Sequence, residues 1–181
     1  MNQTDLAWLA GFTDADGSIA LWGHQEKNGR YKCYPTIIYT NTNPAQIEKV
    51  VTILDSIGVK MHIVERDQSK TSNKWARSWQ VITSNHSYAK IILESILPYL
   101  AGKAPQARLT LRYINSRSNH LRDKITEEEV AIVKEVMDLN KRGISKILTD
   151  YTLGILDNWN QDIVGTTAKS VEMGRNDSSS S

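Results

Sequence analysis

Asp14 and Asp16, which end a predicted N-terminal helix just before Gly17, are the residues best suited to bind a metal ion. A helix C-terminus carries partial negative charge, so carboxylates there cost a few tenths to about 1 kcal/mol. A divalent cation would offset that cost, because hard ions prefer oxygen ligands, including the carbonyls that a helix end exposes. An isolated Asp-Ala-Asp-Gly is also typical of a simple turn.

Side chains two residues apart on a helix point about 200° apart, so Asp14 and Asp16 do not easily share one ion. A paired carboxylate would then have to come from a second subunit. The same helix offers a surface for that subunit, because Ala7 and Gly11 form a strip with almost no side chain. Such a strip lets a partner helix approach closely.

The 181-residue chain has the length of one domain that can bury a core without disulfides. A single cysteine, Cys33, excludes an intramolecular disulfide framework and a cysteine-rich zinc site, and we interpret it as a partly buried strand residue. No apolar stretch is long enough for a membrane span, and the N-terminus lacks a secretion signal. We therefore expect an intracellular protein, cytoplasmic in a prokaryote or located in an organelle, that is not secreted.

The net charge is only +2, but its distribution is uneven. Residues 101–124 contain six basic side chains and one acid, whereas residues 126–162 have a surplus of acids. This asymmetry suits one face that binds a polyanion. Charge runs are also common on ordinary solvated surface, so the pattern alone leaves both interpretations open.

Hydrophobic periodicity and capping residues predict an α+β domain with a four-stranded antiparallel sheet and helices on one face. Asn43 is the predicted N-cap of a helix that begins at Pro44, and Thr126 opens a capping box. After the first helix, the expected strands lie at residues 18–26, 30–41, 60–67 and 75–84. The later helices are expected at residues 44–57, 87–97, 105–116, 127–139 and 144–159.

Alternation along the first two strands separates a core side from an open side. The core side is expected to contain Ile19, Leu21, Ile37 and Tyr39. The open side mixes aromatic, polar and ionisable residues: Ser18, Ala20, Trp22, His24, Glu26, Tyr34, Thr36, Ile38 and Thr40. It is either a solvated face or a ligand surface, and strands of this length span roughly 30 Å, or about nine base pairs of duplex.

The segment 6–18, LAWLAGFTDADGS, closely resembles the LAGLIDADG motif of homing endonucleases, and a strand follows it as that family requires. The α-β-β-α-β-β-α order also agrees with the family. A second segment, residues 153–159, lacks the acid-glycine ending. The chain is therefore similar to the single-motif, homodimeric, intron-encoded enzymes of organelles and archaeal ribosomal RNA genes. We expect residues 1–164 to form the domain and 165–181 to be a flexible tail.

The resemblance implies a role for several residues. Asp16 would bind metal ions between the subunits, assisted by the carbonyl of Ala15; the cofactor would be Mg²⁺, and Mn²⁺ or Ca²⁺ could replace it for binding. Asn41 would orient water, although Asn43 competes for that role, and Lys103 would stabilise charge near the phosphate. Asp14 would mainly tie the helix end to its neighbours. The expected dimer interface contains Ala7, Trp8, Ala10, Gly11 and Asp14.

By the same resemblance the sheet would be a saddle in the major groove of DNA, with alternate side chains reading base edges. The candidate DNA-binding residues are Trp22, His24, Arg30, Lys32, Tyr34, Thr36, Arg66, Arg77 and Gln80. Lys141 and Arg142 would contact phosphates. The sequence leaves open which side of the second hairpin faces the ligand.

The implied activity is a site-specific double-strand DNA endonuclease that works as a homodimer. It would cut a long pseudo-palindromic target and leave short 3′ overhangs. The alternatives are a splicing maturase that binds intron RNA, a catalytically silent DNA-binding protein of the same fold, and a plain structural α+β domain. A structural domain would leave the acid-bearing helix unexplained.

Overall fold

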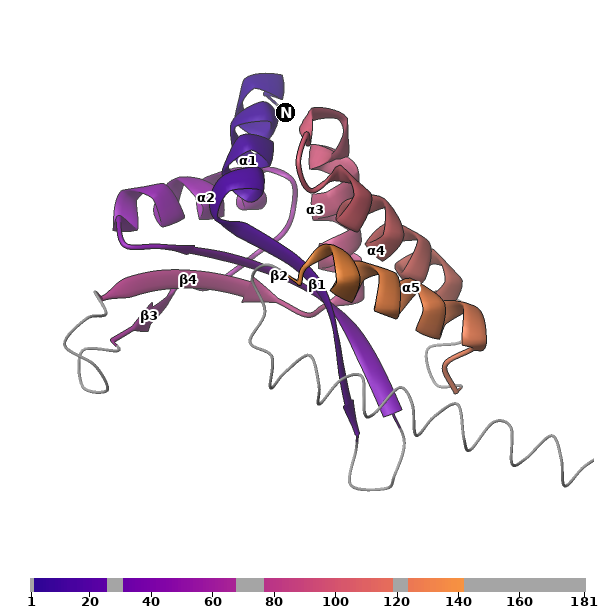
Figure 1. Cartoon of the computed structure of the whole chain (residues 1–181). Helices are drawn as coiled ribbons and strands as arrows, with labels where there is room; N and C mark the ends of the chain where they lie inside the picture. The colour runs from indigo at the N-terminus through magenta and orange to yellow at the C-terminus, as the bar shows by residue number, and fades with distance from the viewer. Residues whose placement is uncertain (1, 26–30, 68–76, 119–123, 142–181) are drawn as a thin grey trace, which may run out of the picture.

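The computed structural model describes residues 2–25, 31–67, 77–118 and 124–141 (Figure 1). The helix expected at residues 144–159, the tail at 165–181, and Arg30 and Arg142 lie outside these residues. None of the described helices is long and apolar enough to cross a membrane.

The order of helices and strands confirms the α+β class expected from the sequence. The elements are α1 (Gln3–Asp16), β1 (Gly17–Gln25), β2 (Tyr31–Asn41), α2 (Pro44–Ser56), β3 (Val64–Arg66), β4 (Ser78–Thr83), α3 (His86–Ile96), the short 3₁₀ helix η1 (Leu97–Tyr99), α4 (Ala104–Arg117) and α5 (Glu127–Leu139).

The strands form one antiparallel sheet in the order β1-β2-β4-β3. All the described helices lie over one face of this sheet (Figure 1). The expected core residues of the first hairpin are correct: Ile19, Leu21, Ile37 and Tyr39 are at most 3% exposed and pack into the main hydrophobic cluster. The sheet therefore has a helix-covered face and an opposite face, called here the open face.

The second hairpin is shorter than expected. β4 pairs with β2 over residues 79–83 but with β3 only over residues 78–80. Val59, three residues after α2, is still buried, and pairing begins only at Val64. All three residues of β3 are exposed, as suits a short edge strand.

The capping residues found in the sequence begin their helices as expected. The Asn43 side chain accepts a hydrogen bond from the Ala45 N–H at 3.1 Å, directly before α2. At α5, the Glu129 Oε2 accepts from the Thr126 N–H at 2.9 Å, and the Thr126 hydroxyl accepts from the Glu129 N–H at 3.3 Å. This capping box fixes the start of α5 over the sheet.

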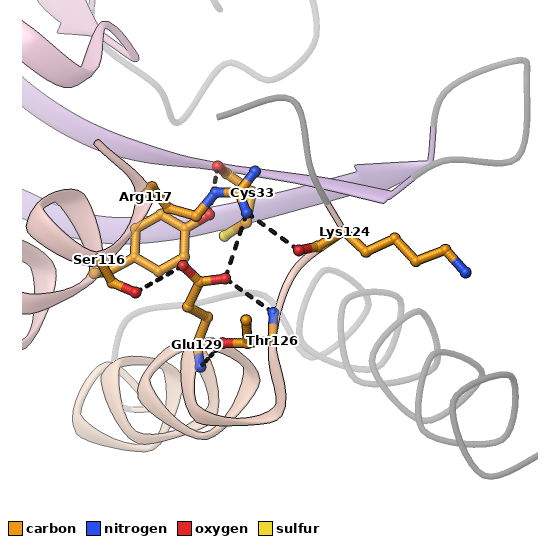
Figure 2. A network of polar contacts seen from close by, with 7 residues as sticks. Cys33, Ser116, Arg117, Lys124, Thr126 and Glu129 are labelled. Atoms are coloured by element: carbon orange, nitrogen blue, oxygen red, sulfur yellow. Dashed lines mark hydrogen bonds and ion pairs between the residues drawn. The ribbon is translucent and has the colours of Figure 1, made fainter. Parts of the chain in front are cut away.

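A buried ion pair joins α4 to α5 (Figure 2). Arg117 Nη1 lies 3.4 Å from Glu129 Oε2, and the two side chains are 6% and 0% exposed. Glu129 also accepts from the Ser116 hydroxyl at 2.9 Å. Arg117 donates to the Lys124 carbonyl at 3.4 Å. These additional bonds offset much of the desolvation cost of burying the two charges.

The same helix α4 is also bonded to the sheet. The Tyr113 hydroxyl donates to the carbonyl of Cys33 at 2.9 Å. Burial raises the pKa of the Cys33 thiol to about 12, so this side chain stays neutral at physiological pH. Cys33 is thus a core residue, more deeply buried than the sequence suggested.

We expect Arg117→Met to destabilise the fold by about 3–5 kcal/mol, because it leaves the Glu129 carboxylate buried without its cation. The matched control is Arg112→Met, which removes an exposed α4–α5 pair with Glu128. That control should cost at most about 1 kcal/mol. Urea unfolding followed by circular dichroism measures both values, and equal losses would show that the buried pair is unimportant.

Candidate active site and sheet surface

The end of α1 brings Asp16 next to Asn41. Asn41 Nδ2 donates to Asp16 Oδ2 at 2.8 Å, and Asn41 Oδ1 accepts from the Asn43 N–H at 2.8 Å. The second bond fixes the amide so that its NH₂ group faces the carboxylate. Asn43 is occupied as the cap of α2, so its side chain is not the one beside Asp16. The two residues meet only through the fold, since they lie on α1 and at the end of β2.

Asp14 is bonded to the backbone of the loop before α4. Asp14 Oδ2 accepts from the N–H groups of Ala101 at 2.7 Å and Gly102 at 3.0 Å. Asp14 Oδ1 accepts from the N–H of Lys103 at 2.7 Å. Burial alone would raise the pKa of Asp14, but these three donors and the charge of Lys103 hold it below its usual value. Asp14 thus ties the end of α1 to this loop.

Lys103 completes the same junction from its side chain. Its ammonium group donates to the carbonyl of Thr13 at 2.9 Å and, through a shorter bond, to the carbonyl of Asp14. A cation at this position neutralises part of the negative end of the helix dipole. The Lys103 ammonium therefore lies against the last turn of α1, which also carries Asp16.

Gly17 allows β1 to leave the helix without a spacer. A Cβ at this position would lie 2.7 Å from Thr13 Cα and 2.9 Å from the Thr13 carbonyl oxygen, so only glycine fits. The Gly17 N–H also donates to the carbonyls of Phe12 and Thr13. Asp16 is therefore held at a fixed place between the helix and the sheet.

The donor set at this end of α1 suits a hard divalent cation. Asp16 and Ala15 are exposed and lie in the last turn, where backbone carbonyls lack intrahelical partners. Among the residues that the structure describes, no group of three or more His, Cys, Asp or Glu side chains could hold a metal ion. A cluster of three or more such ligands around Asp16 would therefore need groups from outside the described part of this chain.

The outer face of α1 has very little side chain. Ala7 and Gly11 are exposed, and a Cβ added to Gly11 would meet nothing within 4 Å. Trp8 borders this strip; it is half-buried, stacks on Phe12 at 5.2 Å between ring centroids, and lies 4.2 Å below the Lys49 ammonium. The helix presents a smooth face to solvent.

Ala10 does not belong to that face, and its expected place in a dimer interface is wrong. It is 0% exposed and packs in the core of its own chain. Helical spacing explains the difference, because Ala10 shares the inner face of α1 with Leu6 and Thr13. Asp14 is half-buried, and its carboxylate points into the loop before α4 and not toward a partner.

The structure settles which side of the second hairpin faces outward. On the open face, Gln80 Nε2 donates to Thr40 Oγ1 at 3.1 Å, and Arg66 Nε donates to Gln80 Oε1 at 3.3 Å. Three strands therefore contribute to one polar group. Trp22 and Tyr34 are half-buried partners across β1 and β2 farther along the same face.

Two of the expected DNA-binding residues have a different setting from the one predicted. Thr36 is only 4% exposed, and its hydroxyl lies 3.0 Å from that of Ser84. Thr36 does lie on the open face, where it lines a hollow with Ser84, but its hydroxyl is already paired with that of Ser84. Arg77, directly before β4, pairs with Glu65 of the edge strand β3 at 2.8 Å.

The remaining basic candidates lie toward the ends of the molecule. His24 is opposite Lys32 in the β1–β2 register. Lys32 lines a cavity of about 230 Å³ with Tyr34, His86 and Arg117. Lys141 follows α5 and pairs with Asp138 at 2.8 Å. Sequence reasoning missed Ile82, which shares the open face with Gln80; counting two residues onward from Gln80 would have found it.

Residues 3–97, more than half of the chain, match the model of a family described as the LAGLIDADG-like domain. The chain belongs to the LAGLIDADG family. Its motif forms α1 and the turn into β1, which is the junction that holds Asp14 and Asp16. The resemblance seen in the sequence is thereby confirmed. No curated protein matches the chain.

Solved homing endonucleases share the fold of this LAGLIDADG protein. I-CvuI, in complex with its target in the presence of 2 mM Ca, has 23% identity and a TM-score of 0.64, covering 80% of this chain and 85% of its own. The archaeal intron-encoded I-Vdi141I, in complex with DNA, has 16% identity and a TM-score of 0.65, covering 87% and 98%. I-TnaI has 18% identity and a TM-score of 0.58, covering 86% and 98%.

We expect Asp14→Asn to lower the free energy of unfolding by about 1–3 kcal/mol at pH 7, because an amide nitrogen would replace one of the two accepting oxygens. The pKa of the Asp14 carboxyl is lowered in the folded protein, so the ionised carboxylate stabilises the fold above about pH 4. This contribution disappears as the pH falls through the lowered pKa. The difference between wild type and variant should therefore shrink toward pH 3.

Urea unfolding at pH 7, 5 and 3 measures this difference directly. Asp55→Asn, an exposed carboxylate on α2, is the matched control and should change little at any pH. If the difference in free energy of unfolding between wild type and Asp14→Asn stays constant from pH 7 to 3, the ionised Asp14 carboxylate does not stabilise the fold.

Proposed function

We propose that this chain is one subunit of a homodimeric, magnesium-dependent homing endonuclease that cuts both strands of a long pseudo-palindromic DNA site and leaves short 3′ overhangs. The observation that carries the proposal is an exposed, amide-bonded Asp16 at the end of a helix with a nearly bare outer face. Residues 1–164 would form its single domain. In support, I-CvuI and I-Vdi141I, which share the fold, were solved in complex with DNA.

Asp16 and the carbonyl of Ala15 are the proposed ligands of Mg²⁺. A bound Mg²⁺ would supply an activated water and stabilise the leaving oxygen of the scissile phosphate. Asn41, fixed by its bond to the Asn43 N–H, would orient the Asp16 carboxylate and a water molecule. Lys103, at the helix end, would donate toward the negative charge that develops on the phosphate.

The second carboxylate would come from a second copy of the chain. Ala7 and Gly11 would let two α1 helices pack closely about a two-fold axis. Trp8 and Asp14 would flank the contact. Both Asp16 residues would then lie near that axis. Each chain would supply half of the active site, which matches the one carboxylate, Asp16, that stays exposed at its helix end while Asp14 is bonded to the loop before α4.

The open face of the sheet is the proposed DNA-binding surface. Gln80 and Arg66 provide amide and guanidinium groups suited to base edges, and Lys32 lies toward the far end of the first hairpin. Lys141 would contact phosphates, since it is exposed after α5. The open face is free of described helices, as a surface that receives a duplex must be.

Asp16→Asn should reduce cutting by at least about 100-fold while DNA binding persists, because the substitution removes a metal ligand but no phosphate contact. Wild type and variant are incubated with Mg²⁺ and a plasmid pool of random inserts, and the cut ends are sequenced. Asp55→Asn is again the control. Unchanged cutting by Asp16→Asn would refute the catalytic role, and binding by wild type without cutting would favour a silent DNA-binding protein.

Ala7→Arg should convert the dimer to a monomer and abolish double-strand cutting, because a long charged side chain fills the strip between the two helices. The control is Ala131→Arg, another exposed alanine in a helix. Light scattering after gel filtration gives the mass of each variant. A wild-type chain that is monomeric both with and without DNA would remove the shared site from the proposal.

A further inference from the structure

A hollow of about 380 Å³ lies on the open face, across the first hairpin and β4. Its walls include the aromatic pair Trp22 and Tyr34 at one end and the aliphatic pair Ile38 and Ile82 at the other. Thr36 lies between the two pairs in the strand register. The hollow is therefore bounded mainly by apolar side chains.

These apolar groups are in contact with solvent. Ile82 is 41% exposed, and Trp22, Tyr34 and Ile38 are half-buried. The hydroxyls of Thr36 and Ser84 bond to each other, so they do not make the hollow a strong hydrogen-bonding site. An apolar ligand group would gain free energy by filling it.

The neighbouring part of the open face has the opposite chemistry. One step along the sheet from the Ile38–Ile82 pair, Thr40, Gln80 and Arg66 form the hydrogen-bonded polar group. A ligand that lies across both regions must offer hydrogen-bonding edges at one place and apolar groups at another. Within the major groove of DNA, the only apolar group on a base edge is the 5-methyl of thymine.

We propose that this hollow reads thymine through its 5-methyl group, an inference that rests on the proposed binding of DNA to the open face. Ile38 and Ile82 supply the contact nearest to the active site, and Trp22 and Tyr34 supply the contact farther out. The hollow contributes to specificity through van der Waals contact with the methyl group. The neighbouring Gln80 and Arg66 contribute through hydrogen bonds.

The strand register places the hollow along the duplex. Ile38 pairs with Ser18, two residues after Asp16, and Tyr34 pairs with Trp22, six residues after Asp16. At about 3.4 Å per residue, these pairs lie roughly 7 and 20 Å along β1 from the helix end. For a duplex that follows the strand, this corresponds to about two to six base pairs from the position of Asp16.

The test uses replacement of thymine by uracil, which removes only the 5-methyl group. Full-length protein in Ca²⁺ selects bound duplexes from a pool with random base pairs, and the enriched duplex is then remade with one uracil at a time. We expect at least one position per half-site, within the window above, where the replacement weakens binding about threefold to fivefold. This ratio corresponds to burial of one methyl group.

Ile82→Ala should erase the thymine preference at one of these positions. Val64→Ala is the matched control, since Val64 is equally exposed at 41% and lies on the same face outside the hollow; it should leave the preference intact. Unfolding curves verify that both variants are folded.

The outcomes separate this inference from the proposed function. Selective binding with equal affinity for thymine and uracil at every position would overturn the inference alone. A methyl effect that survives Ile82→Ala unchanged would also overturn it. Failure to bind any duplex would overturn the proposed function, and the inference with it.

Discussion

The contacts of one carboxylate hold the candidate site together. Asp14 accepts three backbone hydrogen bonds from the loop before α4, and the Lys103 ammonium returns to the last carbonyls of α1. Two carboxylates at the negative end of a helix would otherwise repel it and each other. Because the charge of Asp14 is stabilised by hydrogen bonds from the protein's own backbone, Asp16 can stay exposed in the same turn.

The second constraint is steric. Gly17 leaves no space between the end of α1 and the start of β1, so the position of Asp16 and the direction of the sheet are set together. The buried Arg117–Glu129 pair and the bond from Tyr113 to Cys33 then fix the far end of the sheet under α4 and α5. Both ends of the open face are thus anchored to the helical layer.

Features that depend on neighbours in the sequence could be predicted. The end of α1 before Gly17, the cap at Thr126 and the inward side of β1 and β2 all follow from local spacing. The family resemblance implied a water-orienting residue after β2, for which Asn41 was favoured because Asn43 caps a helix; the fold brings Asn41 beside Asp16. The family resemblance supplied Lys103, whose partners on α1 are about ninety residues away in sequence and leave no local signal.

Contacts between distant segments explain the errors. Periodicity placed Thr36 on the open face correctly but could not show that its side chain would be almost fully buried and its hydroxyl paired with that of Ser84. Similarly, the family resemblance put Ala10 in the expected interface, whereas the folded helix turns it toward the core. The bonds among Thr40, Gln80 and Arg66 also have an evolutionary consequence. A change at Gln80 releases both neighbours. If the open face reads DNA as proposed, new sequence preferences would arise more readily from libraries that vary all three positions together than from single substitutions.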